Sequence, residues 1–181
     1  MSHIFVLMGK AGVGKTTLAR TVVRCSERLV IPLGITTRKP RRDEKDGVDY
    51  RFISLKRFKE WDRQGRFIET TVYRNEHYGL LKQDILELMD KEFDVLTILT
   101  PDGLDVFKKL FGKKVNSIFI TPPSEKELKR RRHQRNNWQA LTQDDDIFGM
   151  NRAYDFKIIN DHLGIACQQI CRIREIVKEG K

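Results

Sequence analysis

The chain has 181 residues and a formal net charge of +10 at pH 7, with 39% hydrophobic and 33% charged residues. This length suits one domain, and the composition is typical of a globular protein, not of a disordered or fibrous one. No apolar run approaches the roughly 20 residues that a membrane-spanning helix needs. The odd number of cysteines, three, favours reduced thiols and a cytoplasmic location.

Hydrophobic patterning predicts an alternation of strands and helices along the chain. Apolar runs predict strands at about 3–8, 29–33, 50–54, 67–73, 93–99, 115–120 and 156–159. Amphipathic periodicity and capping residues predict helices at about 15–27, 55–64, 81–91, 102–111 and 161–178, with further helix starts at Ser124 and Thr142. The alternation predicts an α/β fold with a parallel sheet flanked by helices. Residues 34–80 break it and are expected to form a small, partly β lobe inserted into a core of residues 1–33 and 81–181.

The clearest motif is the run Gly9-Lys-Ala-Gly-Val-Gly-Lys-Thr16, which matches the P-loop pattern G-x-x-x-x-G-K-[ST]. Its glycines let backbone N–H groups turn toward an anion, and the following helix adds its positive N-terminal end. Lys15 is expected to reach the β- and γ-phosphates of a nucleoside triphosphate, and the Thr16 hydroxyl to ligate Mg²⁺. The predicted nucleotide-binding residues of this loop are Gly9, Ala11, Gly12, Val13, Gly14, Lys15, Thr16 and Thr17.

A second basic cluster lies in residues 34–52, GITTRKPRRDEKDGVDYRF. The planar fork of arginine pairs well with phosphate, so Arg38 and Arg41 are expected to converge on one anion. Tyr50 and Tyr78 are expected to add phenolic hydrogen bonds. A solvated surface loop of mixed charge is the alternative interpretation of this stretch.

This stretch resembles the monophosphate-binding segment of guanylate kinases, S-x-T-T-R-x-x-R-x-x-E-x-x-G-x-x-Y. The resemblance extends to FIETTVYRNEHYG, SIFITPPSEKELKRR and YDFKIIND, and with the P-loop it covers nearly the whole chain. It implies a P-loop kinase domain over 1–181, with a monophosphate-binding lobe at 34–80 and a helical lid at about 124–153. The implied reaction transfers the γ-phosphate of ATP to GMP or dGMP, with Mg²⁺ as cofactor.

The resemblance also implies roles for individual residues around the acceptor. It implies that Arg38, Arg41, Tyr50 and Tyr78 bind the acceptor phosphate. Glu69 corresponds to the carboxylate that reads guanine, which is chemically apt because a carboxylate accepts hydrogen bonds from N1–H and the exocyclic amine.

Further residues correspond to the family's catalytic and ATP-binding positions. Arg135 corresponds to a lid arginine that contacts the transferred phosphate, and Arg152 is a candidate for a second one. Asn160 falls where the family approaches the adenine of ATP. The implied catalytic residues are Lys15, Arg38 and Arg135.

Four positions depart from the family pattern. Gly34 stands where a serine is expected, and Leu80 where a small hydroxyl residue follows the Tyr-Gly pair. Ile98 and Thr100 occupy the positions of two acids in the family, one of which helps to read guanine. Asp102 is a possible substitute for that acid. Thr100 is kept as a candidate substrate-binding residue.

Because of these departures, a different phosphorylated acceptor is an alternative substrate. A non-catalytic, guanylate-kinase-like interaction module is disfavoured by the intact P-loop. Nucleic-acid binding is not expected from basic charge alone, because the basic residues Arg130, Arg131 and Arg132 fit the solvated face of a helix. Neither a membrane nor a particular oligomeric state is predicted, and nucleotides are the expected partners.

Overall fold

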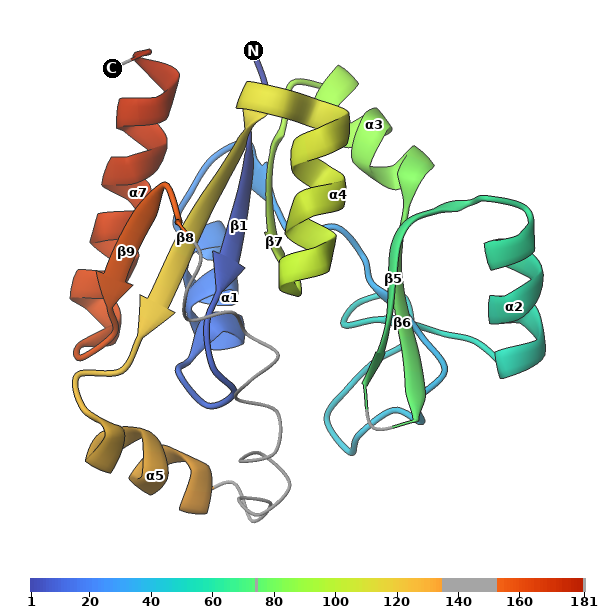
Figure 1. Ribbon diagram of the computed structural model, residues 1–181, viewed down its shortest axis with the longest axis horizontal. Helices are drawn as coiled ribbons and strands as arrows, with labels where there is room; N and C mark the ends of the chain where they lie inside the picture. The colour runs from blue at the N-terminus through green and yellow to red at the C-terminus, as the bar shows by residue number, and fades with distance from the viewer. Residues whose placement is uncertain (74, 135–152, 181) are drawn as a thin grey trace.

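The computed structural model describes residues 1–73, 75–134 and 153–180. Its core is a sheet of five parallel strands in the order β2-β7-β1-β8-β9 (Figure 1). The strands are β1 (Ile4–Met8), β2 (Leu29–Val30), β7 (Asp94–Ile98), β8 (Val115–Thr121) and β9 (Phe156–Ile159). All five residues of β1 are buried, because the strand lies in the middle of a sheet that helices cover on both faces.

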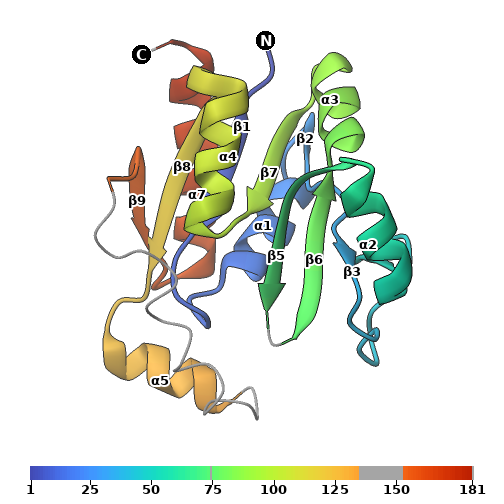
Figure 2. The ribbon, with the colours of Figure 1, turned by 45° about the vertical axis from the view of Figure 1, so that its right-hand side comes forward.

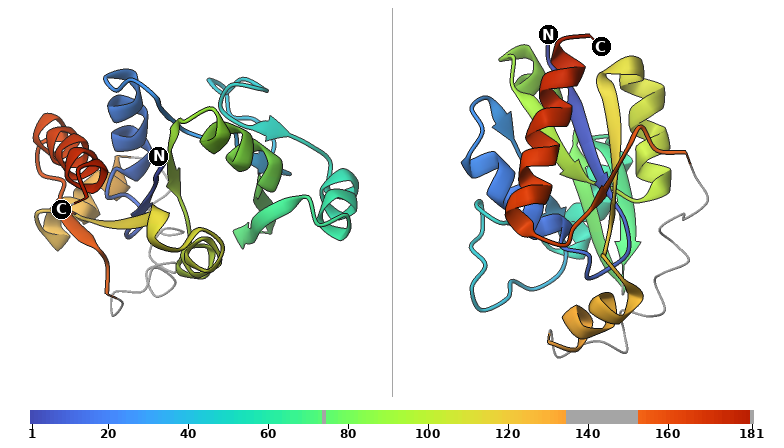
Figure 3. Two further views of the ribbon diagram at one scale, coloured as in Figure 1. Left: turned by 90° about the horizontal axis from the view of Figure 1, so that it is seen from above. Right: turned by 90° about the vertical axis from the view of Figure 1, so that its left-hand side faces the viewer.

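Four helices cover this sheet: α1 (Lys15–Arg24), α3 (Lys82–Asp90), α4 (Pro101–Phe111) and α7 (Leu163–Lys178). Side chains of β1 alternate between the two faces, as the geometry of a strand requires. Phe5 and Leu7 pack with residues of α1 and α7, whereas Ile4 and Val6 pack with residues of α3 and α4. Figure 3 shows the layers, with α1 and α7 on one side of the sheet and α4 on the other.

A second, smaller sheet of mixed direction lies beside the core. Its strands, in the order β4-β3-β6-β5, are β3 (Ile35–Thr36), β4 (Arg51–Phe52), β5 (Phe67–Tyr73) and β6 (Glu76–Leu81). Phe58 and Trp61 of α2 (Leu55–Arg63) pack on Ile35 and Leu81, and so give this sheet a small core of its own. Its outer strand β5 contacts α4 of the main core (Figure 2).

The α/β fold that the sequence predicts is confirmed, and the strands at 67–73 and 156–159 have the expected bounds. The second sheet differs in detail, because β3 and β6 were not predicted. Strand β3 has two residues, too few to show a period, and β6 mixes polar and apolar residues in the run EHYGLL. Such strands form through pairing with their neighbours and not through their own sequence pattern.

Helix starts follow the predicted capping residues. The hydroxyl of Ser54 accepts a hydrogen bond from the backbone N–H of Arg57 at the start of α2. Ser124 does the same for Glu127 at the start of α5 (Glu125–His133). A short 3₁₀ helix, η1 (Gly112–Lys114), follows α4. The helix expected after Thr142 lies outside the described residues.

Cys25, Cys167 and Cys171 are free thiols. Among the helices that the structure describes, none combines the length and the apolar character that a membrane crossing requires.

Candidate active site

The P-loop joins β1 to α1 at the carboxyl edge of the parallel sheet. Gly9 and Gly14 have φ values of 134° and 100°, in the region that favours glycine. A Cβ atom at Gly9 would collide with the backbone carbonyl oxygen of Ile120, and one at Gly14 with the side-chain amide of Asn160. The loop therefore packs so closely against β8 and the end of β9 that both positions require glycine.

Lys15 is the first residue of α1, and its ammonium group lies across the loop. The Nζ atom donates hydrogen bonds to the carbonyl oxygens of Gly9, at 2.6 Å, and Lys10, at 3.0 Å. Thr16 and Thr17 are exposed in the same turn, which contains no acidic residue that would offset the positive end of the helix. An ammonium group, two hydroxyls and a helix N-terminus thus gather at one place, which suits a phosphate chain with Mg²⁺.

Two side chains from distant elements bind carbonyl oxygens of this loop. Asn160 Nδ2 donates to the Val13 oxygen at 2.7 Å, and Arg132 Nε donates to the Ala11 oxygen at 2.9 Å. Arg132 is only 3% exposed, so the expectation that it lies on a solvated helix face is wrong. Asn160 is 6% exposed, and its side-chain nitrogen is engaged with the loop backbone.

An open pocket of about 260 Å³ adjoins the loop. It is lined by Gly12, Gly14, Thr17, Arg131, Gln134, Asn160, Asp161 and Leu163. Within it, Arg131 donates hydrogen bonds to the backbone oxygen of Asn160 at 2.9 Å and to Glu127 at 2.8 Å. The P-loop, α5 and the segment before α7 therefore line one open pocket.

A second basic site lies in the smaller sheet, around Arg38. Its two Nη atoms donate to the carboxylate of Glu44 at 2.8 and 2.9 Å, and the pair is largely shielded from solvent. These hydrogen bonds raise the pKa of Arg38 and, in return, lower the pKa of Glu44. The guanidinium also lies over the rings of Tyr50 and Phe52, at 5.6 and 5.7 Å from their centroids. Arg38 Nε is buried and has no hydrogen-bond partner among the described residues.

The aromatic residues of this site form a connected group. The ring of Tyr78 lies edge-on to the rings of Tyr50 and Tyr73, at centroid distances of 6.2 and 6.5 Å. A tyrosine hydroxyl, with an ordinary pKa of about 10, is a hydrogen-bond donor at neutral pH, and burial raises the pKa of Tyr50 further. Arg41 donates its backbone N–H to Glu44 at 2.8 Å and is itself exposed.

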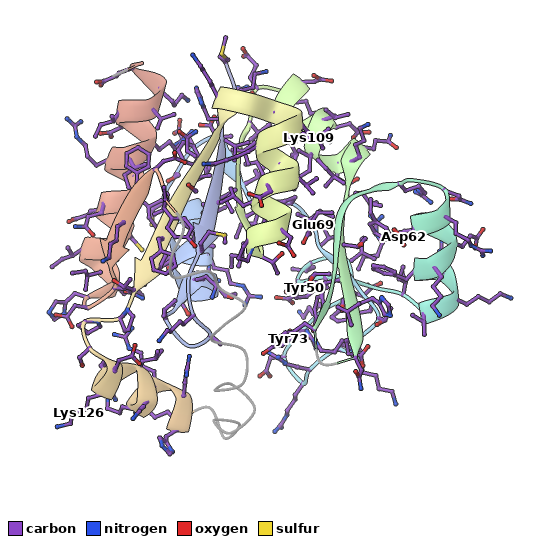
Figure 4. The ribbon with its side chains drawn as sticks, in the orientation of Figure 1. Tyr50, Asp62, Glu69, Tyr73, Lys109 and Lys126 are labelled. Carbon is purple, nitrogen blue, oxygen red and sulfur yellow. The ribbon has the colours of Figure 1, made fainter. Side chains whose placement is uncertain are left out.

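Glu69 lies where the smaller sheet meets the core, between β5 and α4 (Figure 4). A Cβ atom at Gly103 of α4 would come within 2.9 Å of the Glu69 carboxylate, so the two elements approach closely at this glycine. Leu80 is the cross-strand partner of Glu69 in β6, which places both side chains on one face of the sheet. Burial raises the pKa of Glu69 from 4.5 to about 7.

The match to the guanylate kinase family model covers residues 1–176 of the chain. The chain belongs to the guanylate kinase family. The guanylate kinase of Nitrosomonas europaea is 33% identical over 180 residues, which cover 96% of this chain and 89% of that protein. The guanylate kinase of Wolbachia pipientis wMel is 32% identical over 176 residues, with 94% and 88% covered. A crystal structure of guanylate kinase from Anaplasma phagocytophilum has a TM-score of 0.76 at 25% identity, over 96% of this chain and 85% of that one.

Three of the four departures from the guanylate kinase pattern have a structural counterpart in this chain. A Cβ atom at Gly34 would lie 3.0 Å from the ring of Tyr50, so glycine lets that ring pack against the backbone. Leu80 is 8% exposed and belongs to the core under α3 and α4. The Thr100 hydroxyl caps α4 by accepting the N–H of Gly103 at 3.2 Å. Asp102 is exposed in the first turn of α4.

One residue of the guanylate kinase motif, Glu44, was not selected from the sequence. It is the acid of the T-T-R-x-x-R-x-x-E pattern, and its position in the motif was the available signal. Two predicted lid arginines, Arg135 and Arg152, lie outside the described residues. The structure groups the described site residues into two sets. One set is the P-loop with Asn160 and Arg132, and the other is Arg38 with Tyr50 and Tyr78.

Proposed function

We propose that the chain transfers the γ-phosphate of ATP to GMP or dGMP, giving ADP and GDP or dGDP. The observation that carries this proposal is the presence of two separate sites with basic residues, the P-loop with Lys15 and the loop around Arg38 and Arg41. Two such sites match a reaction in which both substrates carry phosphate. Membership in the guanylate kinase family supports guanine as the acceptor base.

The donor site is proposed to consist of the P-loop residues Gly9, Ala11, Gly12, Val13, Gly14, Lys15, Thr16 and Thr17, with Asn160 beside them. Lys15 would exchange its two loop carbonyl oxygens for phosphate oxygens. Thr16 is exposed at the start of α1, and its hydroxyl oxygen would coordinate Mg²⁺, which prefers oxygen ligands. When bound, Mg²⁺ would neutralise charge on the β- and γ-phosphates.

The acceptor site is proposed to consist of Arg38, Arg41, Tyr50 and Tyr78. Glu44 holds the Arg38 guanidinium in a fixed orientation through two hydrogen bonds. Arg38 Nε is buried and has no partner among the described residues, so a phosphate oxygen would reach it only after neighbouring side chains move. Thr100 is proposed to contribute indirectly, because it caps the helix whose first turn contacts Glu69.

The transfer itself requires positioning and charge neutralisation more than acid–base chemistry. An oxygen of the acceptor phosphate attacks the γ-phosphorus while the bond to the bridging oxygen of ADP breaks. Lys15, Arg38 and Arg135 are proposed to neutralise the charge that moves, and no covalent enzyme intermediate is needed. Closure of the lobe at 34–80 and of the lid at about 124–153 would bring the two phosphates into line and exclude water.

The same reaction on another monophosphate is a second candidate. Two residues favour it, because neither is free to hydrogen-bond a base as the family pattern expects. Leu80 is part of the hydrophobic core, and the hydroxyl of Thr100 caps α4. The residue proposed to read guanine is Glu69, whose carboxylate accepts from N1–H and the exocyclic amine.

The decisive experiment is a coupled assay of ADP release with Mg-ATP and a panel of GMP, dGMP, AMP, CMP, UMP, dTMP and IMP. We expect turnover with GMP and dGMP at least 100-fold above the rate with the other bases. Preferred turnover of a different monophosphate would support the second candidate. Binding of ATP without turnover of any of them would argue for the non-catalytic interaction module.

A further inference from the structure

We propose that Arg132 is a positioning residue for the donor nucleotide, because it fixes the Ala11–Gly12 peptide of the P-loop in the orientation that phosphate binding needs. The inference rests on the proposed function only in that the P-loop binds a nucleoside di- or triphosphate. It concerns α5, on which Arg130 is exposed and Arg131 lines the neighbouring pocket. Figure 1 shows α5 next to the loop between β1 and α1.

The first step of the argument is the burial of Arg132. At 3% exposure it is among the most buried charged residues that the structure describes. Arg130, two positions earlier on the same helix, is exposed and pairs with Glu127 at 2.7 Å. Burying a guanidinium is costly unless polar groups compensate it. The partner that compensates Arg132 at its Nε is a backbone oxygen of the P-loop, at 2.9 Å.

The second step is the packing of α5 on the loop. A Cβ atom at Gly12 would lie 3.0 Å from Arg132 Cγ and 3.3 Å from Leu128 Cδ1. Leu128 and Arg132 are four residues apart and so lie on one face of the helix. The alkyl stem of Arg132 therefore rests on Gly12, while its Nε binds the oxygen of the preceding residue.

The third step is peptide geometry. In a trans peptide the C=O and the following N–H point in opposite directions, and the described residues contain no cis peptide bond. Because Arg132 holds the Ala11 oxygen on the side of α5, the N–H of Gly12 must point to the opposite side. Asn160 holds the Val13 oxygen in the same way, which orients the N–H of Gly14.

These contacts fix alternate peptides of the loop. Backbone N–H groups of a P-loop bind the α- and β-phosphates, so a peptide free to rotate would lose a phosphate donor in part of the population. We therefore expect Arg132 to pre-organise the phosphate site through the loop backbone, without itself contacting the nucleotide. It also links α5, part of the expected lid, to the loop that binds the donor.

The experiment measures ADP binding by isothermal titration calorimetry on three variants. Arg132→Met keeps the stem and removes the donor and the charge, whereas Arg132→Lys keeps the charge and removes the Nε donor. Arg130→Met is the matched control, since it removes an exposed arginine from the same helix. Melting temperature and the KM for GMP are measured beside ADP affinity.

We expect the dissociation constant for ADP and the KM for ATP to rise about tenfold in both Arg132 variants, the effect of losing one charge-assisted hydrogen bond. The KM for GMP should stay within twofold, and Arg130→Met should match the wild-type protein. If Arg132→Lys binds ADP as the wild type does, charge alone matters and the inference is wrong. If both Arg132 variants lose stability but keep ADP affinity, the residue only packs. A wild-type protein that binds no ADP would overturn the proposed function together with the inference.

Discussion

Replacement of Glu69 by glutamine tests the most unusual electrostatic feature of the site. The Glu69 carboxylate is packed against the first turn of α4 at Gly103, and burial raises its pKa from 4.5 to about 7. Each pKa unit corresponds to about 1.4 kcal/mol. Below pH 4.5 Glu69 is protonated in both the folded and the unfolded state, and its burial carries no electrostatic penalty. As the pH rises to 7, the free energy of unfolding falls by roughly 3 kcal/mol, because only the unfolded state ionises freely.

Glu69→Gln keeps the shape of the side chain but cannot ionise. We expect the variant to match the wild type in free energy of unfolding at pH 4 and to exceed it by about 1–3 kcal/mol at pH 8. Urea unfolding at both pH values, followed by tryptophan fluorescence, measures this difference. Glu60→Gln is the matched control, because Glu60 is exposed on α2. An equal difference between the variant and the wild type at the two pH values would refute the assigned burial.

The same variant separates stability from recognition. An amide offers one acceptor oxygen where the ionised carboxylate offers two, so we expect the KM for GMP to rise at least tenfold in Glu69→Gln while the KM for ATP stays unchanged. In the wild type the KM for GMP should rise as the pH falls below about 7, because the protonated carboxyl no longer accepts both hydrogen bonds. A pH-independent KM for GMP between pH 6 and 8 would contradict the role of Glu69.

Three further substitutions test other parts of the structure. Gly9→Ala forces a side chain onto the Ile120 carbonyl at a φ of 134°; it should abolish the rise in melting temperature that ADP produces, and a normal rise would contradict the loop packing. Asp94→Asn breaks a buried ion pair with Arg174 at 2.7 Å and should reduce the free energy of unfolding by about 3 kcal/mol with kcat unchanged, as measured by urea unfolding. Arg38→Lys loses the paired hydrogen bonds of the guanidinium and should raise the KM for GMP at least tenfold without altering ADP affinity, which calorimetry can check.

Sequence alone determined the features that depend on residues close together along the chain. The P-loop is such a feature, because its glycines, Lys15 and Thr16 act within one strand–turn–helix unit. The α/β class follows from local periodicity, and the proposal that Arg38 binds a phosphate follows from the motif around it. These predictions needed no knowledge of long-range contacts.

The tertiary structure decided the features that depend on residues far apart in the chain. Arg132 looks like its exposed neighbours in sequence, yet it is buried because α5 packs on a loop some 120 residues earlier in the chain. Leu80 lies opposite Glu69 only because β5 and β6 pair with a register shift between Phe67 and Glu69. Asn160 reaches Val13 because β9 ends next to the P-loop. Burial and hydrogen-bond partners come from such packing, and a linear pattern carries no record of them.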